Sequence, residues 1–90
     1  MSVTVHIPSV LRPYVDNKDI VEIDAKTVEE LLDELAGRYR HLQQLLSDEG
    51  GLRGFVNIYV NDKDIRDLDH YRTVLCGGDV VTLMPAIAGG

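Results

Sequence analysis

The chain has little of several residue types, and each shortage excludes a class of protein. Its 90 residues include a single cysteine, Cys76, and no tryptophan. One cysteine allows no intrachain disulfide and no cysteine-based zinc site, which favours a reducing compartment. No apolar run approaches the roughly 18 residues that cross a membrane, and the first residues lack the basic and apolar segments of a signal peptide. We therefore expect a soluble, cytoplasmic protein.

Positive charge is also scarce. Nine Lys and Arg stand against fifteen Asp and Glu, which gives a net charge of −6. This balance disfavours nucleic acid and anionic membranes as partners and favours a partner with a basic surface. Ninety residues form one domain with a modest core, too small to enclose a cofactor between domains. We expect the chain itself to bind no cofactor and no metal.

No internal cluster of side chains predicts catalysis. His6, His41 and His70 lack the spacing of paired metal ligands, and Cys76 has no neighbouring histidine or cation to activate its thiol. The acidic stretch 62–69 lacks the glycine and the closing glutamate of a calcium loop. A solvated acidic turn is therefore favoured, and contact with a basic partner surface is the alternative role. The segment 77–78 precedes a strand instead of a lysine and a helix, which indicates a turn and excludes a phosphate loop.

Apolar residues that alternate with polar ones predict strands. Val3, Val5 and Ile7 have this period, and a second apolar group at 19–24 completes an N-terminal hairpin. Residues 55–60 are rich in β-branched and aromatic side chains. This strand follows a turn at 48–51. After the strand, a tight turn at 61–64 leads to a short strand at 65–66. A turn at 76–79 then precedes the last strand, 80–84, which Pro85 closes.

A helix is predicted to begin after Thr27, because Thr27 and Glu30 have the spacing of a capping box. Its apolar residues share the spacing of one buried stripe, with acidic residues on the exposed side: Val28, Leu31, Leu32, Leu35 and Tyr39, against Glu29, Glu30, Asp33 and Glu34. Gly37 is either the stop or a weak point. We expect a break between 37 and 41, after which Leu42, Leu45 and Leu46 form a second short helix.

This order of elements predicts an α+β domain of two layers, one main helix against a mixed sheet of four or five strands. The domain covers residues 1–85, and residues 86–90 form a flexible tail. If the first and last strands pair in parallel at the centre, the tail leaves from the middle of the sheet.

The tail holds the strongest functional signal. From Val80 to Gly90 there is no charged side chain, although 27% of the chain is charged. A frayed end alone would explain two terminal glycines, but the lack of charge favours a tail held by a partner. Glycine has no Cβ, so Gly89 and Gly90 can thread a narrow channel, with Ala88 behind them. The reacting group would be the carboxylate of Gly90.

The pattern of the whole chain resembles the ubiquitin-like sulfur carriers of the β-grasp fold. The residues that carry the likeness are Phe55-Val56-Asn57-Ile58-Tyr59-Val60-Asn61, Gly78-Asp79-Val80-Val81 and Pro85-Ala86-Ile87-Ala88-Gly89-Gly90. Relatives include the small subunit of molybdopterin synthase and the sulfur carrier of the thiamine pathway. Together with Val3-Thr4-Val5, Ile7-Pro8 and Leu11-Arg12-Pro13, the pattern is similar to the carrier of a protein-thiocarboxylate route to cysteine.

The resemblance implies a protein cosubstrate without an active site of its own. A partner enzyme would adenylate Gly90 with MgATP, and sulfide or a persulfide would displace AMP to leave a thiocarboxylate. The sulfur acceptor would be a pyridoxal-phosphate cysteine synthase or the large subunit of molybdopterin synthase. Two rival functions remain, a small subunit that completes molybdopterin synthase and a ubiquitin-like modifier joined to lysines.

Partner docking is expected on the open face of the sheet. The apolar candidates for such a patch are Phe55, Tyr59, Leu83 and Met84, although burial in the core is the favoured role of each residue taken singly. Arg53 and Arg66 would flank this face, with solubility as their alternative role.

Overall fold

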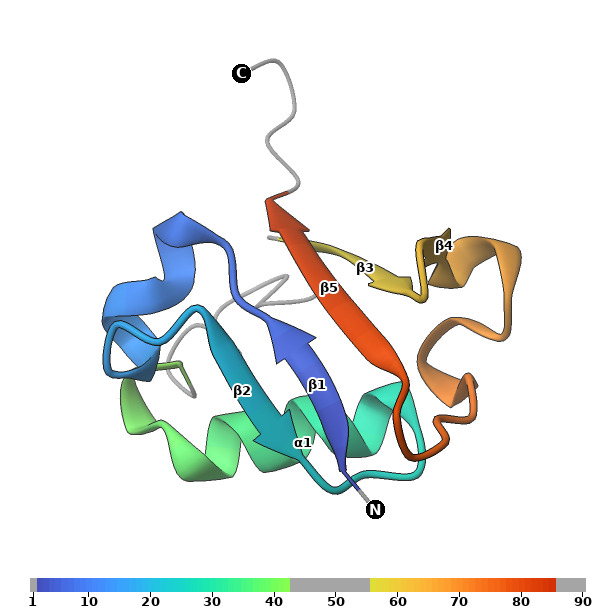
Figure 1. The fold of residues 1–90 in the computed structure, drawn as a ribbon, viewed down its shortest axis with the longest axis horizontal. Helices are drawn as coiled ribbons and strands as arrows, with labels where there is room; N and C mark the ends of the chain where they lie inside the picture. Colours follow the sequence, from blue (N-terminus) through green and yellow to red (C-terminus); the bar gives the residue numbers. More distant parts are fainter. Residues whose placement is uncertain (1, 43–55, 86–90) are drawn as a thin grey trace.

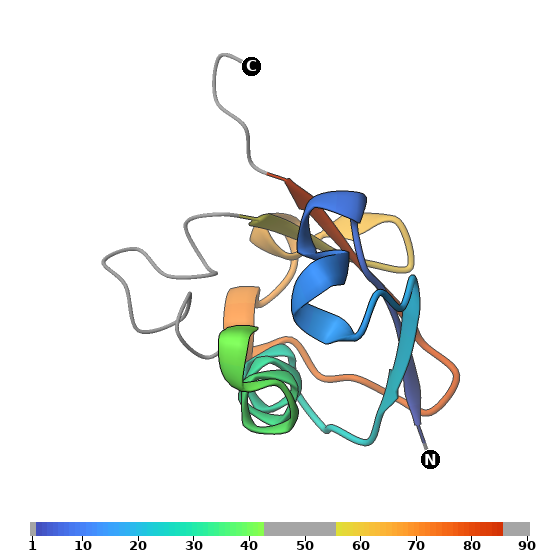
Figure 2. The same ribbon diagram turned by 90° about the vertical axis from the view of Figure 1, so that its left-hand side faces the viewer.

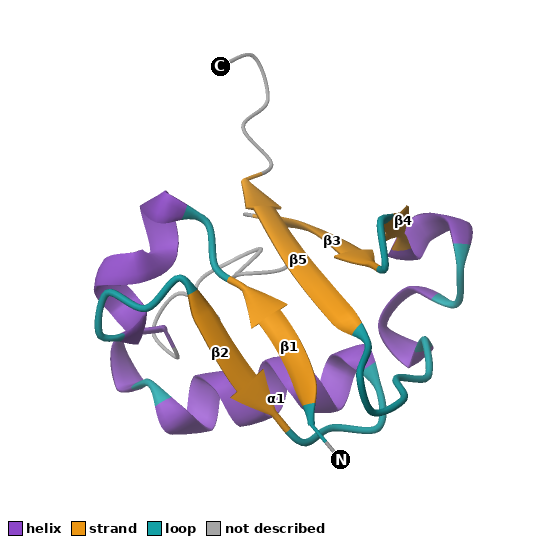
Figure 3. Cartoon of the chain, viewed as in Figure 1, coloured by secondary structure: helices purple, strands orange, loops and turns teal. Residues whose placement is uncertain are grey.

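The computed structural model describes residues 2–42 and 56–85, which form one layer of strands and one layer that contains the main helix (Figure 1). The elements in chain order are β1 (Val3–His6), the 3-10 helix η1 (Ser9–Val15), β2 (Ile20–Ile23), α1 (Val28–Arg38), β3 (Val56–Val60), β4 (Lys63–Asp64), the 3-10 helices η2 (Ile65–Asp67) and η3 (His70–Arg72), and β5 (Val80–Pro85). Figure 3 colours these elements by type.

The five strands form one mixed sheet in the order β2-β1-β5-β3-β4. β1 pairs with β2 in antiparallel and with β5 in parallel orientation, and β3 is antiparallel to β5 and to β4. The first and last strands are therefore parallel neighbours, which fulfils the condition under which the chain leaves from the middle of the sheet. Figure 2, turned by 90°, shows α1 on one side of the sheet, which confirms the two-layer α+β architecture.

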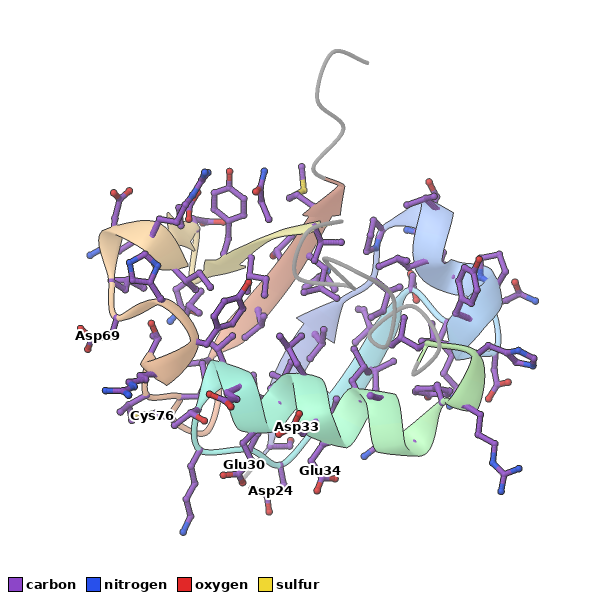
Figure 4. All side chains as sticks on the ribbon, turned by 180° about the vertical axis from the view of Figure 1, so that it is seen from behind. Asp24, Glu30, Asp33, Glu34, Asp69 and Cys76 are labelled. Atoms are coloured by element: carbon purple, nitrogen blue, oxygen red, sulfur yellow. The ribbon has the colours of Figure 1, made fainter. Side chains whose placement is uncertain are left out.

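The core lies between α1 and one face of the sheet. Alternate strand residues face the helix and are almost completely buried, among them Val3, Val5, Val21, Ile23, Val56, Ile58, Val60, Val81 and Leu83. The helix contributes the predicted stripe, Val28, Leu31, Leu32, Leu35 and Tyr39, all of them buried. Figure 4 shows Glu30, Asp33 and Glu34 on the outer side of α1, where their side chains are exposed.

The helix begins as predicted. Thr27 has an extended backbone, and its Oγ1 accepts a hydrogen bond of 3.2 Å from the N–H of Glu30, which satisfies one of the unpaired donors of the first turn. α1 ends at Arg38, Tyr39 is extended, and residues 40–42 are helical again. The break between 37 and 41 is confirmed, although Gly37 itself lies inside the helix. Leu45, Leu46 and the turn at 48–51 lie outside the described residues.

The short strand after β3 lies two residues earlier than predicted. β4 is Lys63–Asp64, and the expected strand at 65–66 is wrong because Ile65 begins η2. Asn61 and Asp62 both have positive φ, 50° and 71°, so they alone form the turn, with the geometry of a two-residue type I′ hairpin. The Asp64 carboxylate then accepts from the N–H of Arg66 at 2.8 Å, which starts the 3-10 turn.

The connection between β1 and β2 is more ordered than the sequence indicated. It contains η1, which has Pro13 inside it and buries Leu11 and Val15 against the core. Asp16 and Asn17 follow with positive φ, 56° and 59°, and reverse the chain into β2. η1 lies beside the end of the sheet at which β5 ends (Figures 1 and 2).

Candidate functional site

The end of β5 determines where the tail begins. β5 lies between β1 and β3, and its last residue, Pro85, pairs with Val56. Because β5 is the middle strand, the chain leaves the sheet at its centre, at the end opposite the N-terminus (Figure 1). Residues 86–90 lie outside the described residues, so the roles of Ala88, Gly89 and Gly90 stay predictions.

In the part of the chain that the structure describes, no helix covers the face of the sheet opposite α1. One row of residues crosses all five strands on this face through the pairs His6 with Ile20, His6 with Thr82, Tyr59 with Thr82, and Tyr59 with Asp64. On β1, β3 and β5 the residues on both sides of this row are buried in the core, so the members of the row point the other way. The row forms the open face predicted for docking.

Tyr59 and Met84 come together on this face. They line a hollow of about 250 Å³ with Asp62 and Thr82, and Met84 is 47% exposed. Leu83 does not belong to this surface. It is 1% exposed and packs in the core, which is the role favoured for it from the sequence, because successive strand residues point to opposite faces. Phe55 lies outside the described residues.

The acidic turn holds an internal ion pair. Arg66 Nη2 lies 2.7 Å from Asp64 Oδ2, and Arg66 Nε donates to the same carboxylate. The hydrogen bonds from the Arg66 side chain lower the pKa of Asp64, and the bond from the Arg66 backbone N–H makes the next largest contribution in the same direction. Asp64 is therefore engaged by Arg66 and less available to a partner. Arg53 lies outside the described residues, and the flanking role of Arg66 remains a prediction.

A polar network fixes the start of β5. The Asn61 side chain donates to Asp79 Oδ1 at 3.0 Å and accepts from the N–H of Val80 at 3.0 Å, while the N–H of Cys76 donates to Asp79 Oδ2 at 2.8 Å. The bond from Cys76 and then the bond from Asn61 lower the pKa of Asp79, against the opposing effect of burial. Gly78 supplies the positive φ of 91° that this turn requires. The network ties the β3–β4 turn to β5.

The remaining candidates stay apart. Among the described residues no three His, Cys, Asp or Glu side chains are placed to hold a metal ion. Cys76 is a free, exposed cysteine beside the Gly77-Gly78 turn. Within residues 2–42 and 56–85, no helix is both long and apolar enough to span a bilayer.

A second hollow, on the other side of Met84, was not anticipated from the sequence. It has a volume of about 260 Å³ and lies between β1, the start of η1 and β5, with Arg12 and His6 among its lining residues. The sequence contained a signal for it. Pro8 followed by apolar residues at 11 and 15 has the spacing of a helical turn that presents the intervening Arg12.

The fold and the chain's Gly-Gly end define a class. A mixed five-stranded sheet packed on one main helix, with the last strand at the centre, is the β-grasp fold of the ubiquitin-like sulfur carriers. The model of the ThiS family matches residues 5–90, and the chain belongs to this family.

Its relatives agree. The chain is 40% identical to the sulfur carrier protein CysO of Mycobacterium tuberculosis, in an alignment of 93 positions that covers the whole of both chains. CysO in the crystal structure of the Amycolatopsis orientalis BexX/CysO complex is 38% identical, with a TM-score of 0.83 over 98% of this chain and 99% of that one. A chain of the complex of subunits 1 and 2 of the Helicobacter pylori molybdopterin-converting factor is 26% identical, with a TM-score of 0.64 over the whole of both chains.

Proposed function

We propose that this sulfur carrier holds sulfur as a thiocarboxylate on Gly90. A partner enzyme transfers AMP from MgATP to the Gly90 carboxylate and releases pyrophosphate. Sulfide then attacks the acyl carbon, and AMP leaves to give the thiocarboxylate. If a persulfide attacks instead, AMP leaves from an acyl disulfide, whose S–S bond a thiol reductant then cleaves to release the thiocarboxylate. The observation that carries the proposal is the position of β5 at the centre of the sheet, because its last residue, Pro85, immediately precedes the uncharged segment that ends in Gly-Gly.

The domain supplies position and recognition, and the partner supplies the chemistry. The five residues 86–90 span at most about 17 Å when extended, which is enough to enter an active-site cleft while the domain stays outside. The described titratable side chains that line the second hollow, with Met84 near the end of β5, are His6, Arg12 and Asp19, and we assign that hollow to docking. We therefore assign the chain the role of a cosubstrate.

The open face would dock the activating enzyme and the sulfur acceptor. Tyr59 and Met84 offer apolar area there, and Met84 lies in β5, two residues before the tail begins. The two complexes that contain structural relatives support such pairwise docking. We propose a pyridoxal-phosphate cysteine synthase as acceptor, because full-length identity to CysO, at 40%, exceeds the 26% identity to the molybdopterin-converting factor chain.

The test is a mass measurement on the intact chain after incubation with its adenylating enzyme, MgATP and a sulfur donor. Replacement of one oxygen by sulfur adds about 16 Da. Incubation without ATP is the control and should leave the mass unchanged. No gain in mass with the cognate enzyme would refute the carrier mechanism.

Changes in the tail test the threading argument. Deletion of Gly90, or addition of one residue after it, should abolish the gain of about 16 Da while the thermal unfolding midpoint stays the same, because the tail lies beyond the last strand. Gly89→Trp should act in the same direction, since a bulky Cβ substituent cannot pass a channel that glycine fits. Normal activation of Gly89→Trp would contradict this reasoning.

Partner capture separates the rivals. Recovery of a molybdopterin synthase large subunit would overturn the assignment to cysteine synthesis and favour a role in molybdenum cofactor synthesis. Conjugates between Gly90 and lysines, found by mass spectrometry of cell extracts, would favour a protein modifier.

A further inference from the structure

The hollow between β1, η1 and β5 has an apolar lining that the folded domain leaves open. Its apolar residues come from three segments and include Ile7, Pro8, Ile20 and Met84. Ile20 is 44% exposed and Met84 is 47% exposed, so both keep apolar area in contact with water. The volume of about 260 Å³ is enough for one aliphatic side chain and a neighbouring polar group.

Arg12 stands at this hollow in a fixed position. Its Nε donates to the backbone carbonyl of Ile7 at 3.2 Å in a partly buried hydrogen bond. The described residues offer no further partner to its two terminal nitrogens, although Asp19 lines the same hollow. The planar guanidinium therefore keeps one edge available, and this edge has the donor geometry that accepts a carboxylate in a bidentate manner.

The charge of the hollow differs from that of the chain. The chain carries a net charge of −6, yet the charged side chains lining this hollow balance each other, Arg12 against Asp19. A carboxylate beside an aliphatic group would satisfy both the guanidinium and the apolar lining. A free anion such as phosphate would leave the apolar lining exposed to water.

We propose that this hollow docks a segment of a partner protein that presents an aliphatic side chain next to a carboxylate, and that Arg12 discriminates among partners. The hollow shares Thr82 and Met84 with the hollow beside Tyr59, so a partner docked on the open face would also reach it. The identity of that partner rests on the proposed carrier function. The chemistry of the hollow does not.

The first test needs only the full-length chain. Acetyl-Leu-Glu-amide, added at roughly millimolar concentration, should shift the NMR signals of the Arg12 Nε–H and the Met84 methyl group. Acetyl-Leu-Gln-amide and inorganic phosphate are the matched probes and should shift the Met84 methyl signal little. Arg12→Gln should remove the response, while Arg72→Gln, on η3 at the opposite side of the molecule, should retain it. No response to the Glu peptide, or an equal response to phosphate, overturns the proposal.

The second test uses the adenylating enzyme from the same genome. Arg12→Ala should raise the KM for the carrier by about tenfold to a hundredfold, and Arg12→Glu further, with kcat little changed. Arg72→Ala should behave like the original chain, and circular dichroism should show each variant folded. If the original chain gains about 16 Da and Arg12→Glu is activated with the same KM, the docking proposal fails and the carrier function stands. If the original chain gains no mass, the carrier function fails, and the peptide titration still decides the hollow.

Discussion

The side chain of Asn61 should stabilise the fold by joining the β3–β4 turn to the start of β5. It donates to Asp79 Oδ1 and accepts from the N–H of Val80, both at 3.0 Å. Two substitutions separate its contributions. Asn61→Gly removes both hydrogen bonds and keeps the positive φ of 50° accessible, whereas Asn61→Ala removes them and also strains the turn.

The magnitudes follow from these contacts. A net contribution of about 0.5–1.5 kcal/mol for each hydrogen bond, at the lower end because Asn61 is exposed, gives a loss of about 1–2 kcal/mol for Asn61→Gly. Alanine in the left-handed conformation adds about 1 kcal/mol of backbone strain, so Asn61→Ala should lower the free energy of unfolding by about 2–3 kcal/mol. For a domain of this size the change corresponds to a fall of about 4–8 °C in the unfolding midpoint for each kcal/mol.

The loss should also depend on pH. The folded-state pKa of Asp79 is lower than its ordinary value of 3.8, so the unfolded chain binds the proton more tightly. The stabilisation is therefore complete above the unfolded-state pKa and disappears as the pH falls through the folded-state value. Because Asn61 donates one of the bonds to this carboxylate, the difference between the original chain and Asn61→Gly should be larger at pH 7 than at about pH 3.

Urea unfolding followed by circular dichroism at both pH values measures these free energies. The slope of the free energy against urea should be unchanged, since the variants expose the same surface on unfolding. The reasoning is refuted if Asn61→Gly is as stable as the original chain at pH 7. It is equally refuted if Asn61→Ala and Asn61→Gly are indistinguishable, because the strain at this turn would then be absent.

The other predictions concern the core and the helix cap. Leu83→Ala should lower the free energy of unfolding by about 3 kcal/mol, because Leu83 is 1% exposed. Met84→Ala should lower it by less than about 1 kcal/mol, because Met84 is 47% exposed. Equal losses in urea unfolding would contradict the assignment of the two residues to opposite faces. Thr27→Ala should remove the acceptor for the Glu30 N–H and cost about 1 kcal/mol, with Thr27→Ser close to the original chain as the control.

Periodicity predicted the elements whose residues obey one simple repeat. The stripe of α1 and the cap at Thr27 are local patterns, and both are present in the structure. The alternation along β1 and the β-branched run of β3 likewise placed these strands to within one or two residues. Each depends on neighbours close in the sequence, which is why the sequence suffices.

The sequence misassigned or left open three features: the strand expected at 65–66, the direction of Leu83, and the connection that contains η1. Asp64 satisfies the N–H of Arg66, so the chain turns into η2 where its composition suggested a strand. Leu83 was an apolar residue next to the tail, and its direction depended on the register of β5 against β1 and β3. η1 was missed because Pro13 indicates a loop, although its ring is tolerated in a short 3-10 helix.

The sequence by itself determined the class of this protein, because a helix stripe, strand alternation and an uncharged Gly-Gly end are properties of consecutive residues. Only the tertiary structure decided which residues form the surface near the end of β5. Strand order placed β5 at the centre, and its pairing brought His6, Thr82 and Tyr59 into one row from three separate segments. The position of Arg12 beside Met84 depends on the packing of η1 against the sheet, since contacts between distant segments are invisible in the linear pattern.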